Sequence, residues 1–236
     1  MKKFLLLLII PFLSFGQDFE PTFTGQLIKH SYFSLSYIEK HEQAEWVCYN
    51  LNREMINGKH KRKHNFKADS KVVTASANKS DYYKSGYDRG HLAPAADMKI
   101  SETAMSESFL FSNISAQNGS FNRGGWLKLE KKVREWVLSE GEMYVVTGPI
   151  LENPIKSIGS NNVTVPNSFY KIIYSKSKNK MIGFIMPNQK INNPLKDYVK
   201  TVDFIESITG IDFFHQLEDK REENLESDIN INNWKF

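Results

Sequence analysis

Two blocks of polar sequence, close together in the chain, carry most of the information about this protein. The first reads YDRGHLAPAADMKI at residues 87–100, and the second reads SNISAQNGSFNRGGWLKLE at residues 112–130. Within the first block, residues 86–92 are typical of a short strand. Because side chains alternate along a strand, Arg89 and His91 are predicted to project to the same side.

An arginine beside a histidine on one strand face has a chemical consequence. Repulsion from the guanidinium of Arg89 favours the neutral imidazole of His91, which is the form that can accept a proton near pH 7. Gly90 between them has no side chain, so another backbone or a ligand can approach closely. The alternative for this tetrapeptide alone is two exposed polar side chains without a function.

The second block combines a polar loop with the start of a helix. Residues 124–139 have apolar side chains at helical spacing, and Gly141 follows their end. Asn122 stands at the entrance to this helix and Glu130 about two turns into it. Taken singly, such an Asn is an N-cap and such a Glu a partner of the helix dipole. Those roles do not explain why all these polar groups surround one strand–loop–helix unit.

The remaining elements indicate an α+β fold with a mainly antiparallel sheet flanked by helices. Strands and helices come in runs rather than in strict alternation, and no repeat or linker divides the chain, so residues 17–236 are predicted to form one domain. The predicted strands are residues 46–51, 142–147, 163–165, 169–175 and 181–186. The predicted helices are residues 101–111, 124–139 and 196–209.

Composition excludes several classes of protein. Apolar residues make up 40% of the chain and charged residues 25%, which argues against wholesale disorder. The single cysteine, Cys48, excludes an internal disulfide and a cysteine-based zinc site, and its apolar neighbours predict a buried side chain. The segment from His41 to Glu45 (HEQAE) begins like a zinc-protease helix but has Glu45 where the second histidine is required. It is therefore predicted to be a surface turn, and a zinc hydrolase is the least favoured alternative.

The first sixteen residues have the pattern of a secretory signal peptide. Lys2 and Lys3 precede an apolar run over residues 4–15, and small residues offer a cleavage site near Gly16. The run is much shorter than the ~20 residues that span a bilayer. We therefore expect a secreted protein, periplasmic or extracellular, without a membrane anchor after cleavage.

Charge is unevenly distributed along the chain. Residues 17–211 contain 26 basic and 20 acidic side chains, whereas residues 212–236 contain three basic and seven acidic ones. Within the basic part, residues 59–67 (KHKRKHNFK) have five bases and no acid. Such a run is often only a solvated loop, but it can also bind phosphates without reading base edges.

Taken together, these blocks resemble the DNA/RNA non-specific endonuclease family, which includes secreted bacterial nucleases and mitochondrial endonuclease G. The resemblance runs from about residue 37 to residue 210 and is carried by DRGH, by SNIS-A-Q and by N-x-x-x-W-x-x-x-E. It implies the ββα-metal, or His-Me finger, fold. The sequence departs from the family at Ala116, where proline is usual, and the acidic tail after residue 211 has no counterpart in the resemblance.

The resemblance also implies a role for each residue of these motifs. His91 is expected to be the general base, Asn122 the direct protein ligand of a Mg²⁺ ion, and Glu130 a holder of that ion's waters. Arg89 and Arg62 are expected to face the scissile phosphate; Arg53 and Lys63 are the alternatives to Arg62 in the alignment. The expected substrate-binding residues are Asn113, Gln117 and Lys63.

The expected activity is hydrolysis of phosphodiester bonds in both DNA and RNA, with Mg²⁺ or a replacement such as Mn²⁺, leaving 5′-phosphate ends. Three alternatives remain open. The chain could be an inactive nuclease-like domain that only binds nucleic acid, a nuclease restricted to DNA, or a toxin held by an inhibitor protein. A homodimer is a further partner prediction.

Overall fold

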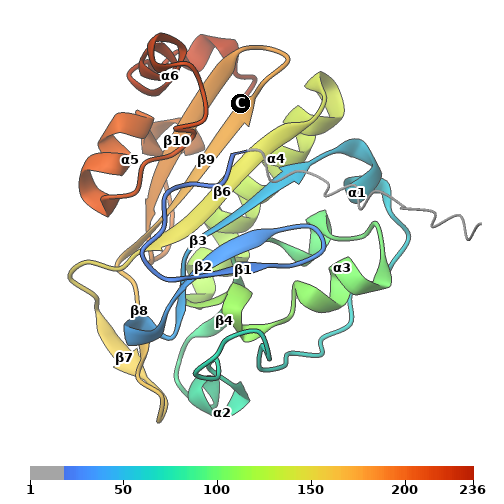
Figure 1. The fold of residues 1–236 in the computed structure, drawn as a ribbon, viewed down its shortest axis with the longest axis vertical. Coiled ribbons are helices and arrows are strands. Elements are labelled where there is room, and N and C mark those ends of the chain that lie inside the picture. Colours follow the sequence, from blue (N-terminus) through green and yellow to red (C-terminus); the bar gives the residue numbers. More distant parts are fainter. Residues whose placement is uncertain (1–18) are drawn as a thin grey trace, which may run out of the picture.

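A seven-stranded antiparallel sheet crosses the molecule, and the helices and smaller strand pairs lie around it (Figure 1). In the computed structural model, residues 19–236 are described. The strand order is β1-β2-β3-β6-β9-β10-β11. The strands are β1 (Gln26–Lys29), β2 (Ser34–Ile38), β3 (Gln43–Leu51), β6 (Met143–Ile150), β9 (Ser168–Ser175), β10 (Lys180–Pro187) and β11 (Val199–Lys200).

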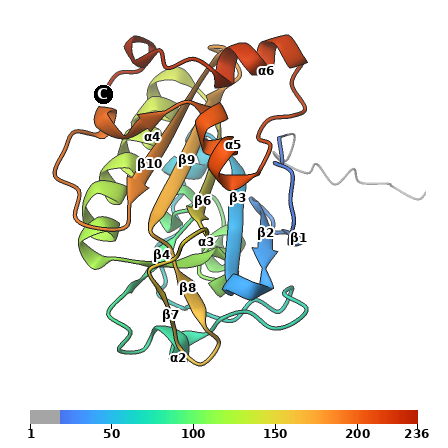
Figure 2. The ribbon, with the colours of Figure 1, turned by 90° about the vertical axis from the view of Figure 1, so that its left-hand side faces the viewer.

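Both faces of this sheet are buried, because alternate side chains of each central strand enter different apolar clusters. In β3, Val47 and Tyr49 belong to the cluster beneath α4 (Leu127–Glu140). Trp46 and Cys48 belong to the cluster beneath α5 (Val202–Thr209). Figure 2 shows α4 on one side of the sheet and α5 with α6 (Asp219–Glu226) on the other.

The ββα unit that the two blocks predict stands beside this sheet. β4 (Asp88–His91) pairs antiparallel with β5 (Ile114–Gln117), and a π-helical segment (Phe121–Trp126) leads directly into α4. The other elements are the short helices α1 (Arg53–Asn57), α2 (Lys79–Tyr82) and α3 (Glu102–Glu107) and the hairpin of β7 (Lys156–Ile158) with β8 (Val163–Val165).

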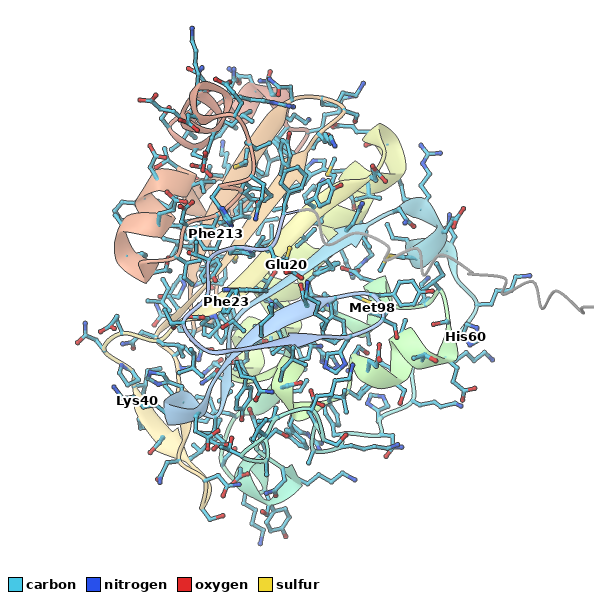
Figure 3. The ribbon with its side chains drawn as sticks, in the orientation of Figure 1. Glu20, Phe23, Lys40, His60, Met98 and Phe213 are labelled. Carbon is cyan, nitrogen blue, oxygen red and sulfur yellow. The ribbon has the colours of Figure 1, made fainter. Side chains whose placement is uncertain are left out.

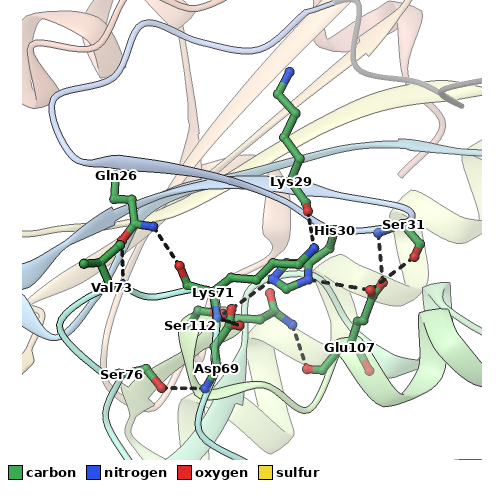
Figure 4. Close-up of polar contacts among 12 residues, drawn as sticks. Gln26, Lys29, His30, Ser31, Asp69, Lys71, Val73, Ser76, Glu107 and Ser112 are labelled. Carbon is green, nitrogen blue, oxygen red and sulfur yellow. Dashed lines mark hydrogen bonds and ion pairs between the residues drawn. The ribbon is translucent and has the colours of Figure 1, made fainter.

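A buried polar network ties the β1–β2 edge to the layer that carries the ββα unit (Figure 4). His30 follows β1 and is only 6% exposed; its Nε2 lies 3.0 Å from Asp69, and its Nδ1 lies 3.7 Å from Glu107 of α3. Burial by itself lowers the pKa of His30, but the two carboxylates outweigh it and the pKa is raised. Ser112, which precedes β5, donates to Asp69 at 2.6 Å. The network therefore connects three segments that are distant in the sequence.

Most of the predicted elements are confirmed. The strands predicted at residues 46–51, 86–92, 142–147, 163–165, 169–175 and 181–186 correspond to β3, β4, β6, β8, β9 and β10, and the helix at 124–139 corresponds to α4 with the π-helical turn before it. Cys48 is buried, as expected, and burial raises the pKa of its thiol. The predicted signal peptide lies outside the described residues.

Three expectations need correction. The helix predicted at 101–111 ends at Glu107, because the chain turns away and Leu110 bridges to Lys67. The helix predicted at 196–209 is interrupted, because residues 199–200 pair with β10 as an edge strand before α5 begins. The segment 41–45 is a turn only as far as Glu42; Gln43 and Glu45 are buried in β3, where Glu45 accepts hydrogen bonds from the N-terminal segment.

The acidic C-terminal residues are not a loose tail. Phe213 and Phe214 are fully buried against the sheet, and the labelled Phe213 can be followed in Figure 3. Further along, Trp234 packs edge-on against Trp136 of α4, with ring centroids 4.7 Å apart. The segment therefore contributes to the cores on both faces of the sheet.

Candidate active site

A cavity of about 740 Å³ lies against the ββα unit and brings together residues from both sequence blocks. Its wall contains five lysine or arginine side chains and only two carboxylates, Asp88 and Glu130. The residues that line it include Arg62, His64, Phe66, Lys79, Tyr83, Lys84, Tyr87, Asp88, Arg89, His91, Asn122, Arg123 and Glu130. This excess of positive charge suits an anionic ligand.

His91 is held at the end of β4 with a free imidazole. The residue is 7% exposed, and its Nε2 is buried without a hydrogen-bond partner among the residues that the structure describes. Burial, together with smaller contributions from the nearby Arg62, His64 and Arg89, lowers the pKa of His91 to about 3. The neutral ring expected from the sequence is therefore present, but burial contributes more than the arginine does.

Two phenylalanines form the platform on which the charged groups rest. His91 lies edge-on to Phe109, with ring centroids 4.9 Å apart, and 5.6 Å from Phe66. The guanidinium carbon of Arg89 lies 4.3 Å from the centroid of Phe66, and that of Arg62 lies 5.4 Å from the centroid of Phe109. Arg89 and His91 thus share one strand face, as alternation predicts, and Arg62 joins them from the basic loop. The labelled His60 marks the beginning of this loop after α1 (Figure 3).

Asn122 does not cap a helix; it lies inside the π-helical segment. Asn118, four residues earlier, accepts hydrogen bonds from the backbone at the start of this turn. The amide nitrogen of Asn122 donates to Asp88 at 2.9 Å, and Asp88 also pairs with Arg123 at 2.7 Å. Since Asp88 holds the NH₂ group, the amide oxygen is the free end of the side chain.

Glu130 reaches the same cavity from α4, one turn before Arg134. Burial raises the pKa of its carboxyl, and the strongest opposing influence is the ammonium group of Lys171. Lys171 is 1% exposed, donates to Thr147 and stacks 4.9 Å above the ring of Trp126. Arg134 pairs instead with the buried Asp97 at 2.7 Å.

These residues fit a hard divalent cation. Oxygen is the donor that Mg²⁺ prefers, and an ion that keeps most of its waters needs few protein ligands. A neutral amide oxygen fixed by a carboxylate behind it, with a second carboxylate in the same cavity, meets that requirement. Asn122 would be the direct ligand and Glu130 would hold its waters.

The three predicted substrate-binding residues do not line this cavity. Asn113 is fully buried, where its amide bonds to both backbone groups of Ala93. Gln117 is also fully buried, and its side chain fills the space left by Gly90. Lys63 is exposed on another part of the surface, paired with Glu102 at 2.5 Å. As folded, Asn113 and Gln117 support β4 instead of facing a ligand.

Sequence reasoning gave no role to several residues of the site: Asp88, Phe66, Phe109, Arg134 and Lys171. Asp88 is part of the DRGH motif, but alternation assigns it to the strand face opposite Arg89. Phe66 is the one large apolar residue of the basic run at 59–67, and its presence there was a signal that part of this loop packs against the protein. Lys171, the one charged residue among residues 168–175, was a second available signal.

The comparison with known proteins agrees with this geometry. The model of the family described as "DNA/RNA non-specific endonuclease" matches residues 14–220. The chain belongs to this family. The resemblance inferred from the sequence, and with it the ββα-metal fold, is confirmed, and the nucleases of this family depend on a divalent cation.

The individual proteins to which this chain is similar include several mitochondrial nucleases. A nuclease of Syncephalastrum racemosum is 34% identical over 82% of this chain and 69% of its own length. Human mitochondrial endonuclease G is 33% identical over 80% of this chain and 69% of its own length, and zebrafish EXOG is 35% identical over 78% and 59%. A crystal structure of the EndoG/EndoGI complex matches with a TM-score of 0.77 and 31% identity, covering 84% of this chain and 89% of the other.

Proposed function

We propose that this protein is a secreted endonuclease that hydrolyses phosphodiester bonds in DNA and RNA, with Mg²⁺ as its metal and 5′-phosphate ends as its product. The observation that supports this most directly is the neutral, unpaired imidazole of His91 in a basic cavity with Asn122 and Glu130. No residue of the cavity wall comes from a motif that reads base edges, so backbone phosphates are the recognised feature.

The residues of the cavity divide the reaction between them. His91 takes a proton from a water molecule as the water oxygen attacks phosphorus, and the bond from phosphorus to the 3′ oxygen breaks. The leaving 3′ oxygen takes a proton from solvent water and becomes a 3′-hydroxyl, while the phosphate stays on the 5′ side. Arg89 and Arg62 bind the non-bridging phosphate oxygens. A bound phosphate adds negative charge beside these cations, which raises the proton affinity of His91 during the reaction. Asn122 and Glu130 would hold a divalent cation, which would supply charge stabilisation to the leaving oxygen.

The test is cleavage of plasmid DNA and of structured RNA by the mature protein, with Mg²⁺ or with EDTA, beside His91→Ala. We expect both substrates to be cut, EDTA to stop cutting, and the substitution to reduce the rate by about 10²–10⁴. His64→Ala is the matched control, because His64 lines the same cavity. This variant is expected to keep most of the activity.

Each other outcome has a defined meaning. Cutting of DNA alone restricts the substrate but keeps the mechanism. Binding without cutting moves the protein to the binding class, and near-normal cutting by His91→Ala contradicts the assignment of the base. End labelling that succeeds only after phosphatase treatment supports 5′-phosphate products.

Secretion and protein partners are further proposals, supported by the N-terminal sequence and by one structural relative. The signal-like residues 1–16 support export, and no helix within residues 19–236 is long and apolar enough to cross a membrane. Export predicts that the mature chain begins directly after Gly16 or close to it, which mass spectrometry can measure. The structural relative was solved in the EndoG/EndoGI complex, which supports an inhibitor protein as a partner; the molar mass in solution tests the homodimer.

A further inference from the structure

A second group of carboxylates lies between α5 and α6, on the face of the sheet that α4 does not cover (Figure 2). Asp203 and Glu206 belong to α5, and Glu226 is the last residue of α6. One carboxylate oxygen from each of the three lies within 4.8 Å of the others. The three residues range from exposed to buried, so the group begins at the surface and extends inward.

Glu226 is the feature that separates this group from an ordinary acidic surface. Its side chain reaches into the cluster, the residue is only 4% exposed, and its Oε1 is buried without a hydrogen-bond partner. A buried carboxylate is costly unless it is paired, binds a metal or takes up a proton, and with no cation bound the pKa of Glu226 is raised to about 9 by burial and by the neighbouring acids. Among residues 19–236, no lysine or arginine lies within 4.0 Å of any of the three carboxylates.

The groups around Glu226 add further negative charge to the cluster. The charged groups that act on Glu226 are all acidic: Glu206, Glu222, Asp203 and Asp212. Glu206 is already oriented, because its Oε1 accepts a hydrogen bond of 2.7 Å from the backbone N–H of Phe213. This arrangement leaves its second oxygen for another partner.

We propose that Asp203, Glu206 and Glu226 form a calcium-binding site that joins α5 to α6. All the donors are oxygens, which Ca²⁺ accepts at about 2.3–2.6 Å in flexible geometry, so that two oxygens on one ion can be about 5 Å apart. Zinc is disfavoured because the three donors include no nitrogen or sulfur. Magnesium is disfavoured because its smaller octahedral shell rarely takes three carboxylates.

The site gives a function to the acidic C-terminal segment, which the nuclease chemistry leaves unused. A bound Ca²⁺ neutralises charge where α6 ends and holds this helix against α5 and the sheet. The consequence is a more stable C-terminal lobe at the calcium concentrations found outside cells.

Calorimetric titration of CaCl₂ into the chelator-treated full chain tests the proposal. Asn122→Ala serves as the background, so that the nuclease site does not contribute. We expect one site with a Kd of about 10⁻⁴–10⁻³ M. The melting temperature should rise by about 3–5 °C at a calcium concentration ten times the Kd.

Glu226→Gln in the same background should weaken calcium binding at least tenfold and abolish the rise in melting temperature, while melting in EDTA near pH 7 should change little because Gln replaces a carboxyl that is largely protonated there. Asp203→Asn, at an exposed position that does not endanger folding, should also weaken binding. Glu223→Gln is the matched control, since it removes the same charge from an exposed position on α6. Absence of calcium heat, equal effects of Glu223→Gln and Glu226→Gln, or tighter binding of MgCl₂ than of CaCl₂ would overturn the assignment.

Discussion

Asp88 has no chemical step of its own, yet it determines where the oxygen of Asn122 points. Its carboxylate holds the amide nitrogen of Asn122 at 2.9 Å and has Arg123 as a second partner. Loss of a group that orients a metal ligand typically weakens the metal about 10–100-fold. We therefore expect Asp88→Ala to raise the Mg²⁺ concentration for half-maximal activity by about that factor.

A Mg²⁺ titration of the initial rate measures this effect. Arg123→Gln is the control, because it removes the other partner of Asp88 and keeps the contact with Asn122. Equal Mg²⁺ requirements in wild type and Asp88→Ala would show that Asp88 is not needed to orient the amide of Asn122.

Lys171 is a buried cation whose main electrostatic partner is Glu130. Burial lowers its pKa, and it opposes the rise in the pKa of Glu130. In Lys171→Met the pKa of Glu130 should rise further, so less of the carboxylate is ionised at pH 7. A rise of one unit from about 7 lowers the ionised fraction at pH 7 from about one half to about one tenth, so we expect the activity there to fall about fivefold and to recover as the pH is raised.

The pH profile separates this effect from a loss of stability. Removing one partner of a buried pair leaves the other charge uncompensated, so Lys171→Met is also expected to melt earlier than wild type. Lys180→Met is the control, because Lys180 stacks 4.1 Å above Trp234, away from the cavity. A flat change in rate at every pH would exclude the link to Glu130.

At the scale of the element, the β4–β5 pair depends on Gly90. A methyl group there would stand 2.1 Å from Oε1 and 2.4 Å from Cγ of the buried Gln117, so this side chain would have to shift. Overpacking of this kind costs about 1–3 kcal/mol, so Gly90→Ala should lower the free energy of unfolding by that amount. Gly124→Ala, in the π-helical turn with nothing within 4 Å, should leave it unchanged or slightly increased. Urea unfolding of both variants gives the comparison.

The elements also show how far the sequence carries the prediction. Strands such as β9 and β10 were predictable because both are long apolar runs bounded by turns. The interruption of the helix at 196–209 was not, because Val199 and Lys200 form a strand only where β10 offers an edge. Thr201, whose side chain caps α5 by accepting from Phe204, was the local signal for the true helix start.

The residues of the candidate site likewise include some that the sequence predicts and some that it does not. His91, Arg89, Asn122 and Glu130 come from motifs and converge on one cavity as expected. The burial of Asn113 and Gln117 could not be predicted, because a polar loop next to a site has the same composition whether its amides face a ligand or the backbone. Only the pairing of β5 with β4, which buries these two side chains, decides between the two.

At the scale of the whole molecule, the basic loop at 59–67 and the acidic C-terminal segment lie on different parts of the fold (Figure 1). Lys59 and Lys61 are exposed and lie in the chain just before Arg62, which lines the cavity. If each contacts one phosphate, Lys59→Ser with Lys61→Ser should reduce the slope of log KM against log salt concentration by about 2, with little change in kcat. Lys178→Ser, at an exposed position, is the control and should leave the slope unchanged. An unaltered slope in the double variant would show that the nucleic acid does not contact Lys59 and Lys61.

The His30 network, which joins the sheet edge to the ββα layer, makes one contribution to the pH dependence of stability. Burial alone would raise the pKa values of Asp69 and Glu107, but hydrogen bonds lower both, so their contribution is lost as the pH falls below about 4. The pKa of His30 is raised, so its contribution is complete below about 6.5 and is lost as the pH rises through the folded-state value. Thermal unfolding should therefore give the highest melting temperature between about pH 5 and 6.5 for this network. In His30→Gln the decline on the alkaline side should become shallower, with the remainder coming from Glu206 and Glu226, whose pKa values are raised to about 7 and about 9, whereas in His215→Gln, at an exposed position, the decline should be unchanged. A decline of equal steepness in wild type and His30→Gln would assign the alkaline loss of stability to another group.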